Sequence, residues 1–498
     1  MTRRSLWRSF ALAPLTLALG ACMNLGPNYK LPNDALVNAP LAQGPIAGAD
    51  KAPVSQGEVP NDWWRLYDDP TLDQLVQDAL QSNASLRVAA ANLARSRAAL
   101  DVANAQGGFS GGATVGFQRA QESAEQYLLF SKLPVENLGS LGVNVSYELD
   151  LFGKLRRGVE SAEAEDEAVL AAADLARITV VADVVQAYVE SCSAGEELAI
   201  AQESLKLQQQ RVALTKRLRD AGRGNQPDVT RGVTQVQTLA ADIPRFQGRQ
   251  RIAQYQLAML LARPPAELPP AVLSCNRLPK LKQPIPVGDG AALLRRRPDV
   301  REAERQLASA TAKIGVAMAA MYPDISIGAS VGSVGIASDL FSPITNSWSF
   351  GPLINWTFPA NGQRARVRGA QAATAGALAH FDGVVLNALR ETQSSLATYA
   401  ADTQRADSLR TAYGSARQSA DETHRLYSAG RESFLSDLDA TRTLTAAHSQ
   451  VAAAEGQVAL DQVKLFLALG GGWQPDQEKP APADAASGTQ AAQPVRAQ

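Results

Sequence analysis

Cysteine and histidine, the side chains that most often carry catalysis or hold metal ions, are rare in this sequence of 498 residues. There are three of each, and they are widely separated: Cys22, Cys192, Cys275, His380, His424 and His448. Because no CxxC pair occurs, we expect neither a metal site nor a dense disulfide scaffold. No stretch has the pattern of a phosphate-binding loop or a catalytic triad. The sequence therefore predicts a protein that is not an enzyme and has no cofactor.

The charged side chains are balanced, with 48 Lys and Arg against 49 Asp and Glu. A net charge of -1 excludes a polycation that binds nucleic acid by neutralising phosphates. It also excludes an acidic, disordered chain. A hydrophobic content of 45% instead indicates a long, ordered chain, and its length alone would suggest several domains.

The cysteine with the clearest chemical context is Cys22. Basic residues precede an apolar run at 10–19, which is shorter than the ~20 residues of a membrane span. Residues 1–21 are therefore interpreted as a signal peptide, with a short membrane anchor as the alternative. Residues 19–22 (LGAC) resemble the bacterial lipobox, which predicts a diacylglyceryl group and an N-terminal acyl chain on Cys22. Met23 is not Asp, as in lipoproteins sorted to the outer membrane.

An internal duplication organises the rest of the chain. Residues 80–102 are similar to 294–316, and a second similar pair follows in the same order. We infer a lipidated extended tether at 22–60, repeats at 61–285 and 286–472, and a disordered tail at 473–498. Each repeat should contain an initial helix, two strands, one long helix and one returning helix.

The helices are long and carry two apolar stripes each. The initial helices are expected at 72–106 and about 294–320, and the helical hairpins at 155–262 and 361–469. Each long helix should reach about 100 Å. In the second returning helix, two sets of apolar residues recur every seven positions on nearly opposite sides: Leu444, Val451, Val458 and Leu465; and Ala446, Ala453, Leu460 and Leu467. Two opposite stripes predict a neighbouring helix on either side, which favours a curved wall or cylinder of helices. A coiled-coil rod remains the alternative.

Four segments alternate between apolar and polar residues, as strands with one dry face do: 109–118, 140–151, 324–334 and 347–358. Each has the length of a tilted transmembrane strand, and aromatic residues such as Trp348 and Trp356 lie near the ends. A soluble sheet shows the same pattern, but the lipid anchor favours the membrane. No later segment offers ~18 consecutive apolar residues, so we expect no transmembrane helix.

Four strands cannot close a barrel, because small barrels need ~8 strands. Open strand edges are not tolerated in lipid, so several copies must pool their strands. A dimer or a trimer would satisfy this condition. A conducting pore favours the trimer, because an eight-stranded barrel is filled by its own side chains.

Several stretches resemble the outer-membrane factors of tripartite efflux pumps, the TolC/OprM-like family, in its lipoprotein (NodT-type) branch. They are residues 26–29 (GPNY), 63–64 (WW), 69–72 (DPTL), 147–154 (YELDLFGK), 296–301 (RRPDVR), 322–323 (YP) and 427–430 (YSAG). The resemblance implies a mixed α and transmembrane β fold in a homotrimer, with a shared 12-stranded β-barrel above a periplasmic α-barrel of coiled-coil-like helices. It also implies a periplasmic membrane-fusion adaptor and an inner membrane RND-type transporter as partners.

By the same resemblance, a periplasmic gate falls on Leu435, Asp439 and Arg442. Three symmetry-related copies of Asp439 around one axis would repel each other unless a cation compensates them. Arg442 is three residues further on and shares the same side of the helix. The alternative is an ordinary pair on a helix surface, which contributes little.

The two helix reversals are the expected adaptor-docking turns. They contain Gly222 with Arg223 and Gly430 with Arg431. A glycine at such a position readily takes a positive φ, so ordinary helix capping is the alternative, and both roles can coexist.

The remaining cysteines, Cys192 and Cys275, are expected to form a disulfide. Free thiols are rarely retained in an oxidising compartment. Counting residues from the helix reversal places the two cysteines at similar heights along the first hairpin.

The function that follows is a passive exit duct in the outer membrane, for drugs, other toxic solutes or metal ions. Two alternatives remain open from the sequence. One is the outer membrane duct of a type I protein secretion system, and the other is a non-conducting lipoprotein that spans the envelope.

Overall fold

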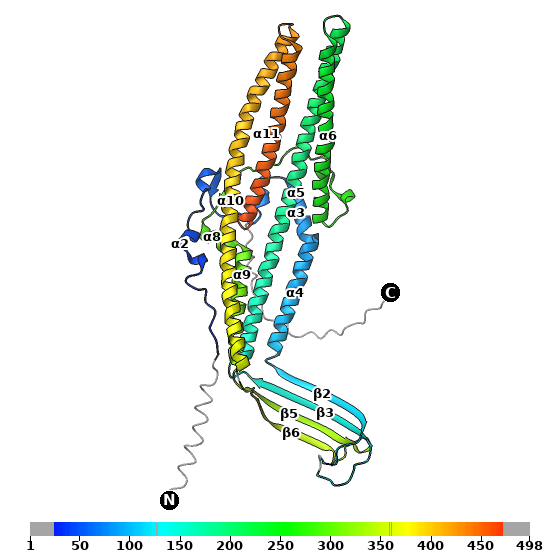
Figure 1. The fold of residues 1–498 in the computed structure, drawn as a ribbon, viewed down its shortest axis with the longest axis vertical. Coiled ribbons are helices and arrows are strands. Elements are labelled where there is room, and N and C mark those ends of the chain that lie inside the picture. Colours follow the sequence, from blue (N-terminus) through cyan, green and yellow to red (C-terminus); the bar gives the residue numbers. More distant parts are fainter. Residues whose placement is uncertain (1–23, 126–127, 358, 360, 472–498) are drawn as a thin grey trace.

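The molecule is elongated, with a four-stranded sheet at one end and the turns of two helical hairpins at the other (Figure 1). The computed structural model describes residues 24–125, 128–357, 359 and 361–471. The predicted signal peptide, Cys22 and the predicted tail at 473–498 lie outside the described residues.

The two hairpins form the long shaft. The first joins α5 (Lys154–Asp220) to α6 (Gln226–Leu260), and the second joins α10 (Asn361–Ser428) to α11 (Phe434–Ala468). With 67 and 68 residues, α5 and α10 are each about 100 Å long. Their lengths and positions agree closely with the hairpins expected from the periodicity.

The initial helix of each half is broken, where the sequence predicted a single helix at 72–106 and another at about 294–320. In the first half, α3 (Pro70–Ser82) ends and α4 (Ala84–Ala105) begins at Asn83, whose side chain accepts hydrogen bonds from the first turn of α4. In the second half, α8 (Gly290–Arg296) is separated from α9 (Pro298–Ala319). A proline disfavours the helical conformation in the residue before it, so Pro298 explains the break at Arg297.

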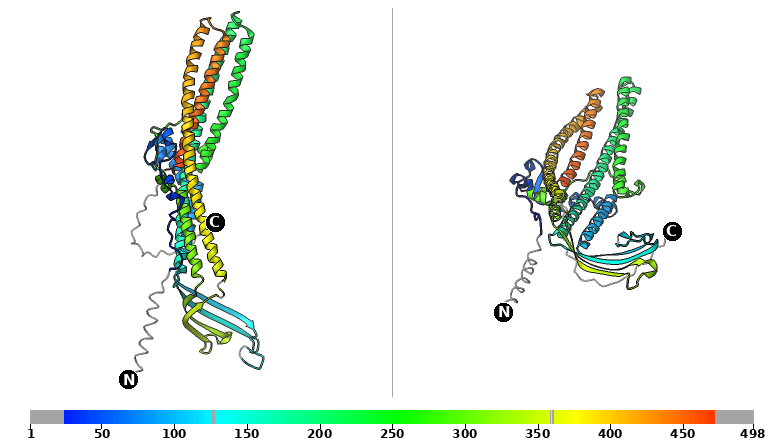
Figure 2. Two further views of the ribbon diagram at one scale, coloured as in Figure 1. Left: turned by 60° about the vertical axis from the view of Figure 1, so that its left-hand side comes forward. Right: turned by 60° about the horizontal axis from the view of Figure 1, so that its bottom comes forward.

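The short helices continue the lines of the returning helices. In Figure 1, and in the right-hand view of Figure 2, α4 lies beyond the end of α6. Asn83 Nδ2 donates to Leu260 O at 2.8 Å, and Ser82 Oγ donates to Leu261 O at 2.9 Å. Two short helices joined end to end therefore run beside one long helix.

The sheet contains β2 (Phe109–Ala120), β3 (Glu136–Leu149), β5 (Asp324–Ile336) and β6 (Asn346–Asn355). Each of the four predicted strand segments overlaps one of them. The strands are antiparallel in the order β2-β3-β5-β6, so β2 and β6 are the edges. The two halves of the duplication thus contribute two adjacent strands each.

One face of this sheet is apolar and uncovered. The register places Ala113, Val143, Val331 and Trp348 in one row across the four strands. In the single chain, Trp348 is 81% exposed and Val331 is 62% exposed. Water is a poor solvent for such a face, so another apolar phase must cover it.

The main core lies at mid-height, where the short elements meet the shaft. Trp63 is 1% exposed, and its ring stacks on Phe466 of α11 with centroids 4.5 Å apart. A parallel pair of β1 (Val54–Gln56) and β4 (Ile285–Val287) lies beside this core. The remaining short elements are η1 (Leu36–Asn38), α2 (Pro40–Gln43), η2 (Ala49–Lys51), η3 (Trp63–Tyr67), η5 (Pro265–Glu267), α7 (Pro270–Leu273) and η6 (Ala337–Asp339). The segment predicted as an extended tether therefore contains short helical turns and a strand.

Helix α10 contains an apolar stretch of which only a small part is buried. By length and composition alone, one stretch of it is apolar enough to cross a membrane, with a mean hydropathy of 1.2 and 17% of its residues buried. The helix runs along α9 and α11 instead of standing alone. Part of its apolar surface is exposed in the single chain, for example Leu386 at 54%.

Candidate functional site

The end of the shaft farthest from the sheet holds the two predicted docking turns. Gly222 has a φ of +73° and Gly430 a φ of +71°, which glycine adopts without strain. Arg223 N donates to Leu218 O at 2.8 Å, and Arg431 N donates to Leu426 O at 2.9 Å. The two turns therefore end their long helices with the same glycine motif.

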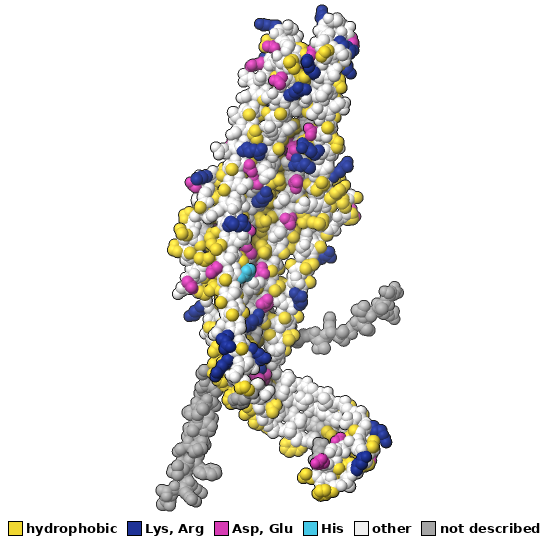
Figure 3. Space-filling view, in the orientation of Figure 1, with side chains coloured by type: hydrophobic (Ala, Val, Ile, Leu, Met, Phe, Trp, Pro, Cys, Tyr) yellow, Lys and Arg dark blue, Asp and Glu magenta, His cyan; other side chains and the backbone are white. Residues whose placement is uncertain are grey.

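The returning helices are capped alike. Asn225 accepts from Asp228 N at 2.9 Å, and Ser433 accepts from Ser436 N at 3.1 Å. A Cβ at Gly222 or Gly430 would meet no atom within 4 Å, so both turns project into open space. Side chains of both charges lie at this end of the shaft (Figure 3). The turns thus combine helix capping with an exposed, charged surface.

The predicted gate residues share one exposed face of α11. Leu435 is 53% exposed in the single chain, and Asp439 and Arg442 are exposed too. Their spacing of four and then three residues places the side chains on one side of the helix. Arg442 Nε donates to Gln235 Oε1 of α6 at 2.8 Å. Arg442 therefore ties α11 to the first hairpin, and its guanidinium has a partner other than Asp439.

The opposite face of α11 carries a buried carboxylate that the sequence analysis missed. Asp437 is 2% exposed. Arg211 of α5 approaches Asp437 Oδ2 to 3.4 Å and also contacts the hydroxyl of Thr441. His424 Nδ1 of α10 lies 3.1 Å from Asp437 Oδ1. Asp437 thus connects three helices near the tip.

A signal for Asp437 was present in the repeat pattern. The stripe that includes Leu444 and Val451 continues seven residues back to Asp437, and the second stripe continues back to Asp439. A polar residue in an otherwise apolar seam specifies alignment at a cost in stability. The first stripe is the more buried one in the single chain, and the second is the more exposed. Asp437 therefore faces the other helices of the same chain, and Asp439 faces away from them.

Aromatic packing surrounds this connection. Phe434 is 8% exposed, and its ring lies edge-on to Tyr427, with centroids 6.1 Å apart. Burial raises the pKa of the Tyr427 hydroxyl above its ordinary value. A Cβ on Gly232 of α6 would meet Val212 at 2.8 Å, so this glycine permits a close approach of the two helices of the first hairpin.

The N-terminal segment is fastened where the shaft meets the sheet. Arg157 of α5 is 1% exposed and donates to Leu25 O at 3.0 Å, Gly26 O at 3.2 Å and Asn28 Oδ1 at 2.7 Å. Gly26 has a φ of +88°, and a Cβ there would meet Gly315 Cα at 2.5 Å. The chain therefore leaves this site toward Cys22 from a fixed position at the sheet end of the shaft.

Cys192 and Cys275 are joined by a disulfide, with their Cα atoms 4.9 Å apart. Cys192 lies in α5 and is fully buried, whereas Cys275 follows α7. Gly195 makes the approach possible, because a Cβ there would overlap the Cys275 carbonyl oxygen. The bond fastens the connection between the two repeats to the shaft.

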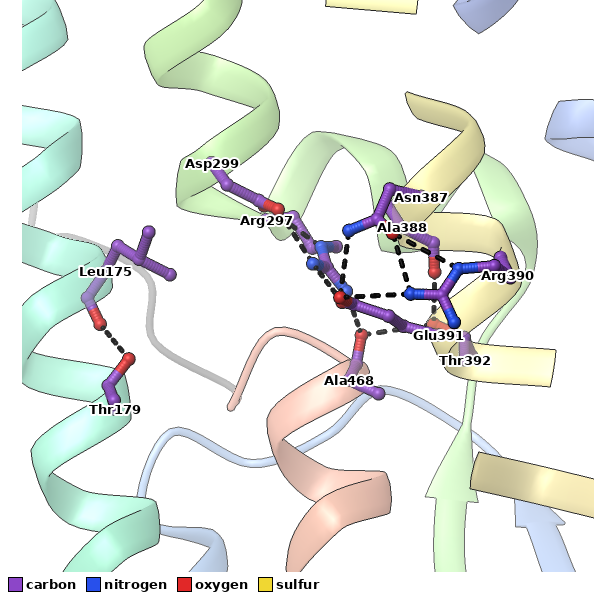
Figure 4. Close-up of polar contacts among 10 residues, drawn as sticks. All are labelled: Leu175, Thr179, Arg297, Asp299, Asn387, Ala388, Arg390, Glu391, Thr392 and Ala468. Carbon is purple, nitrogen blue, oxygen red and sulfur yellow. Dashed lines mark hydrogen bonds and ion pairs between the residues drawn. The ribbon is translucent and has the colours of Figure 1, made fainter. Parts of the chain in front are cut away.

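Arg297, between α8 and α9, links the end of α11 to α9 and α10 (Figure 4). It donates to Asp299 at 2.7 Å, to Glu391 at 2.8 Å and to Ala468 O at 2.8 Å. Thr392 Oγ1 also donates to Ala468 O, at 3.1 Å. These contacts satisfy carbonyls that a helix C-terminus leaves free, so this polar cluster serves architecture.

The described residues show no arrangement suited to metal chemistry. Within 24–125, 128–357, 359 and 361–471, no group of three or more His, Cys, Asp and Glu could hold a metal ion. What the geometry does provide is a long shaft, an uncovered apolar sheet and a tip whose helices are tied by polar contacts.

Comparison with known proteins agrees with this architecture. The profile of the family described as "Outer membrane efflux protein" matches residues 75–263 and 291–471. These two segments correspond to the two halves of the duplication.

Two relatives are similar over almost their whole length. Nodulation protein T of Rhizobium leguminosarum bv. viciae is 30% identical over 467 residues, which are 93% of this chain and 93% of the relative. The probable efflux pump outer membrane protein TtgC of Pseudomonas putida is 31% identical over 472 residues, covering 93% of this chain and 95% of the relative.

A solved structure has the same fold. The outer-membrane channel OprN is 34% identical and superposes with a TM-score of 0.82, covering 91% of this chain and 100% of the channel chain. The fold is therefore that of a TolC-like outer membrane channel. On the family match and the extent of these similarities, the chain belongs to the outer membrane efflux protein family.

Proposed function

We propose that this protein is the outer membrane exit duct of a tripartite efflux pump. The apolar face of the β2-β3-β5-β6 sheet carries this conclusion, because nothing in the described part of the chain covers it. Its family membership and its similarity to efflux channels agree with an outer membrane location. A duct of this kind does no chemistry, and the energy for export comes from a partner.

Three copies would form the duct. Edges β2 and β6 leave backbone groups unpaired, which lipid does not tolerate. Pairing β2 of one copy with β6 of the next closes a 12-stranded barrel in a trimer. Two apolar residues of α5 that lie seven positions apart support the same assembly, since Leu207 is 52% and Leu214 is 42% exposed in the single chain. These side chains would be buried against a neighbouring helix in an α-barrel.

The tips of the hairpins would contact the pump's other components. The turns around Gly222, Arg223, Gly430 and Arg431 are exposed, as suits docking to a periplasmic membrane-fusion adaptor. An inner membrane RND-type transporter would supply the solute. The cargo class we propose is drugs and other toxic solutes, with metal ions as the alternative.

A lipid would hold the N-terminus. Arg157 fixes residues 25–28 at the sheet end of the shaft, and Cys22 lies only three residues before Leu25. A diacylglyceryl group on Cys22 would therefore enter the leaflet nearest the shaft. Repeats at 61–285 and 286–472 would then form the body of the duct.

The gate would lie at Leu435, Asp439 and Arg442, whose shared face would point toward the trimer axis. Single-channel conductance in planar bilayers tests this function and this gate together. We expect small conductance steps from the wild-type protein and larger ones from a variant carrying Asp439→Ala and Arg442→Ala. Asp421→Ala with Arg425→Ala, an exposed pair on α10, is the matched control.

The outcomes separate the possible functions. A protein that inserts but conducts no ions would contradict the duct and favour the envelope spacer. Conductance that the gate variant leaves unchanged would move the gate elsewhere. Deleting the gene should raise sensitivity to drugs or metals while leaving the set of secreted proteins intact, and the reverse result would indicate protein secretion.

A further inference from the structure

The first turns of α10 carry an unusual cluster of positive charge. Arg364, Arg366 and Arg368, here called the α10 arginine cluster, are all exposed. Residues 340–381 contain no Asp or Glu, so this part of the chain supplies no countercharge. The positive end of the α10 dipole adds to the same charge. Figure 3 shows Lys and Arg side chains gathered where the shaft meets the sheet.

The corresponding start of α5 is built differently. Lys154 contacts Asp324 at 3.0 Å, and Arg156 contacts Asp150 at 3.1 Å. Within the described part of the chain, none of the three guanidinium groups of the α10 arginine cluster has a carboxylate at salt-bridge distance. Among the described residues, the cluster has one side-chain hydrogen-bond partner, Gln363, which accepts from Arg366 at 3.0 Å. Carboxylates thus neutralise the start of α5, whereas the equivalent start of α10 stays positive.

The cluster lies at the level where a membrane surface is expected. Strand β6 ends at Asn355, and α10 begins at Asn361. Phe152 and Tyr322 stack at this junction with ring centroids 4.7 Å apart, and Trp356 is 50% exposed beside it. Aromatic side chains mark the headgroup level of membrane proteins. At about 1.5 Å per residue, the arginines lie within roughly 10 Å of the start of the helix.

The position of the N-terminal segment gives independent support for this level of the membrane surface. A Cβ on Gly153, the residue before α5, would overlap the side chain of Asn24. Asn24 is therefore held at the junction, two residues from the predicted lipid attachment at Cys22. The acyl chains and the aromatic residues thus place the membrane surface at the base of α5 and α10.

We propose that the α10 arginine cluster binds the anionic headgroups of phospholipids in the periplasmic leaflet of the outer membrane. This inference rests on the proposed function, because it requires the sheet to cross that membrane. Guanidinium groups form bidentate hydrogen bonds with phosphate oxygens, which suits a phosphatidylglycerol headgroup. Zwitterionic phospholipids have no net charge and should bind weakly. Bound anionic lipid would fix the height of the duct in the membrane.

Native mass spectrometry of the acylated, detergent-solubilised protein tests the proposal. The probes are dioctanoyl phosphatidylglycerol, dioctanoyl phosphatidylethanolamine and inorganic phosphate. We expect preferential binding of phosphatidylglycerol that weakens as salt screens the charges. Arg364 and Arg368 share one side of the helix, so replacing all three arginines by glutamine should reduce this binding by about fivefold for each of these two. Inorganic phosphate binding as tightly would contradict recognition of a lipid.

Two controls isolate the cluster. Arg405→Gln with Arg417→Gln and Arg425→Gln removes the same charge from exposed positions farther along α10, and it should leave phosphatidylglycerol binding unchanged. Replacing the cluster by lysines should keep most of the binding.

Equal binding of both phospholipids by the wild-type protein would overturn the proposal, even if the glutamine variant failed to assemble. Equal phosphatidylglycerol binding by the wild type and the glutamine variant would overturn it too. In either case, ion conductance by the wild-type protein would leave the proposed duct intact.

Discussion

At the residue scale, Asp437 is the group that ties the tip of the chain together. Its carboxylate is buried and accepts contacts from Arg211 and His424, which lie on two other helices. Removing one partner from a buried ion pair is costly, because the remaining charge loses its compensation. Since Arg211 is partly exposed, we expect a loss of about 2 kcal/mol for Arg211→Met.

This loss should loosen the tip and widen the closed duct. Arg211→Met should show larger conductance steps and faster proteolysis near the hairpin turns than the wild type. Arg217→Met, an exposed arginine on the same helix, is the control. Adding Asp437→Leu to Arg211→Met should recover part of the stability. Identical behaviour of Arg211→Met and Arg217→Met would show that the pair does not hold the tip.

A second buried carboxylate should make the stability of the shaft depend on pH. Burial raises the pKa of Asp461, and neighbouring Asp402 adds to the rise. A raised pKa means that the folded state favours the protonated form. Asp461 therefore lowers stability at neutral pH, and the penalty is relieved as pH falls through its folded pKa toward the ordinary value of about 4.

Asp461→Asn should remove this penalty. We expect a thermal midpoint at pH 7 at or above that of the wild type, and a smaller gain in stability on acidification from pH 7 to about pH 5. Circular dichroism melts at several pH values measure both effects, with exposed Asp421→Asn as the control. A variant less stable than the wild type at pH 7 would indicate that the Lys464 and Gln457 contacts outweigh burial.

At the element scale, the disulfide holds the inter-repeat connection against α5. It closes a loop across a sequence separation of 83, for which the chain-entropy account gives about 4.5 kcal/mol of stabilisation. Cys192→Ser with Cys275→Ser should therefore lower the thermal midpoint and expose this connection to protease. Reduced wild-type protein should behave like the variant. Two reactive thiols in denatured, non-reduced wild-type protein would contradict the bond.

The sequence predicted the long elements well because periodicity reports them directly. Alternation revealed all four strands, and seven-residue spacing revealed both hairpins. The breaks at Asn83 and before Pro298 were missed, because the apolar pattern continues across them. Local capping and the residue preceding proline decide those positions, as the hydrogen bonds of Asn83 show.

The candidate site was predicted less completely. The turn glycines and the exposed face of α11 were found, but the buried contact of Arg211 with Asp437 joins residues 226 positions apart. No local pattern specifies such a partner. The seam position of Asp437 indicated that a polar group would be buried, and only the packing of α5 against α11 shows what compensates it.

At the scale of the whole molecule, one chain is an incomplete structure. Its sheet has two open edges and an uncovered apolar face, and its helices expose a second apolar stripe. Copies arranged around one axis would pair the edges and bury the second stripe, and lipid would cover the apolar face of the sheet. The central claim is therefore that neighbouring copies pair β2 with β6.

Cross-linking between edge strands tests this claim most directly. Thr114 on β2 and Ser347 on β6 share one row of the sheet, three strand spacings or about 14 Å apart, too far for a disulfide within one chain. Thr114→Cys would be combined in turn with Ser347→Cys, Ser349→Cys or Leu353→Cys. We predict that at least one combination gives covalent dimers and trimers in outer membranes under oxidation. Only monomers from every combination, in protein that has reached the outer membrane, would contradict the shared barrel.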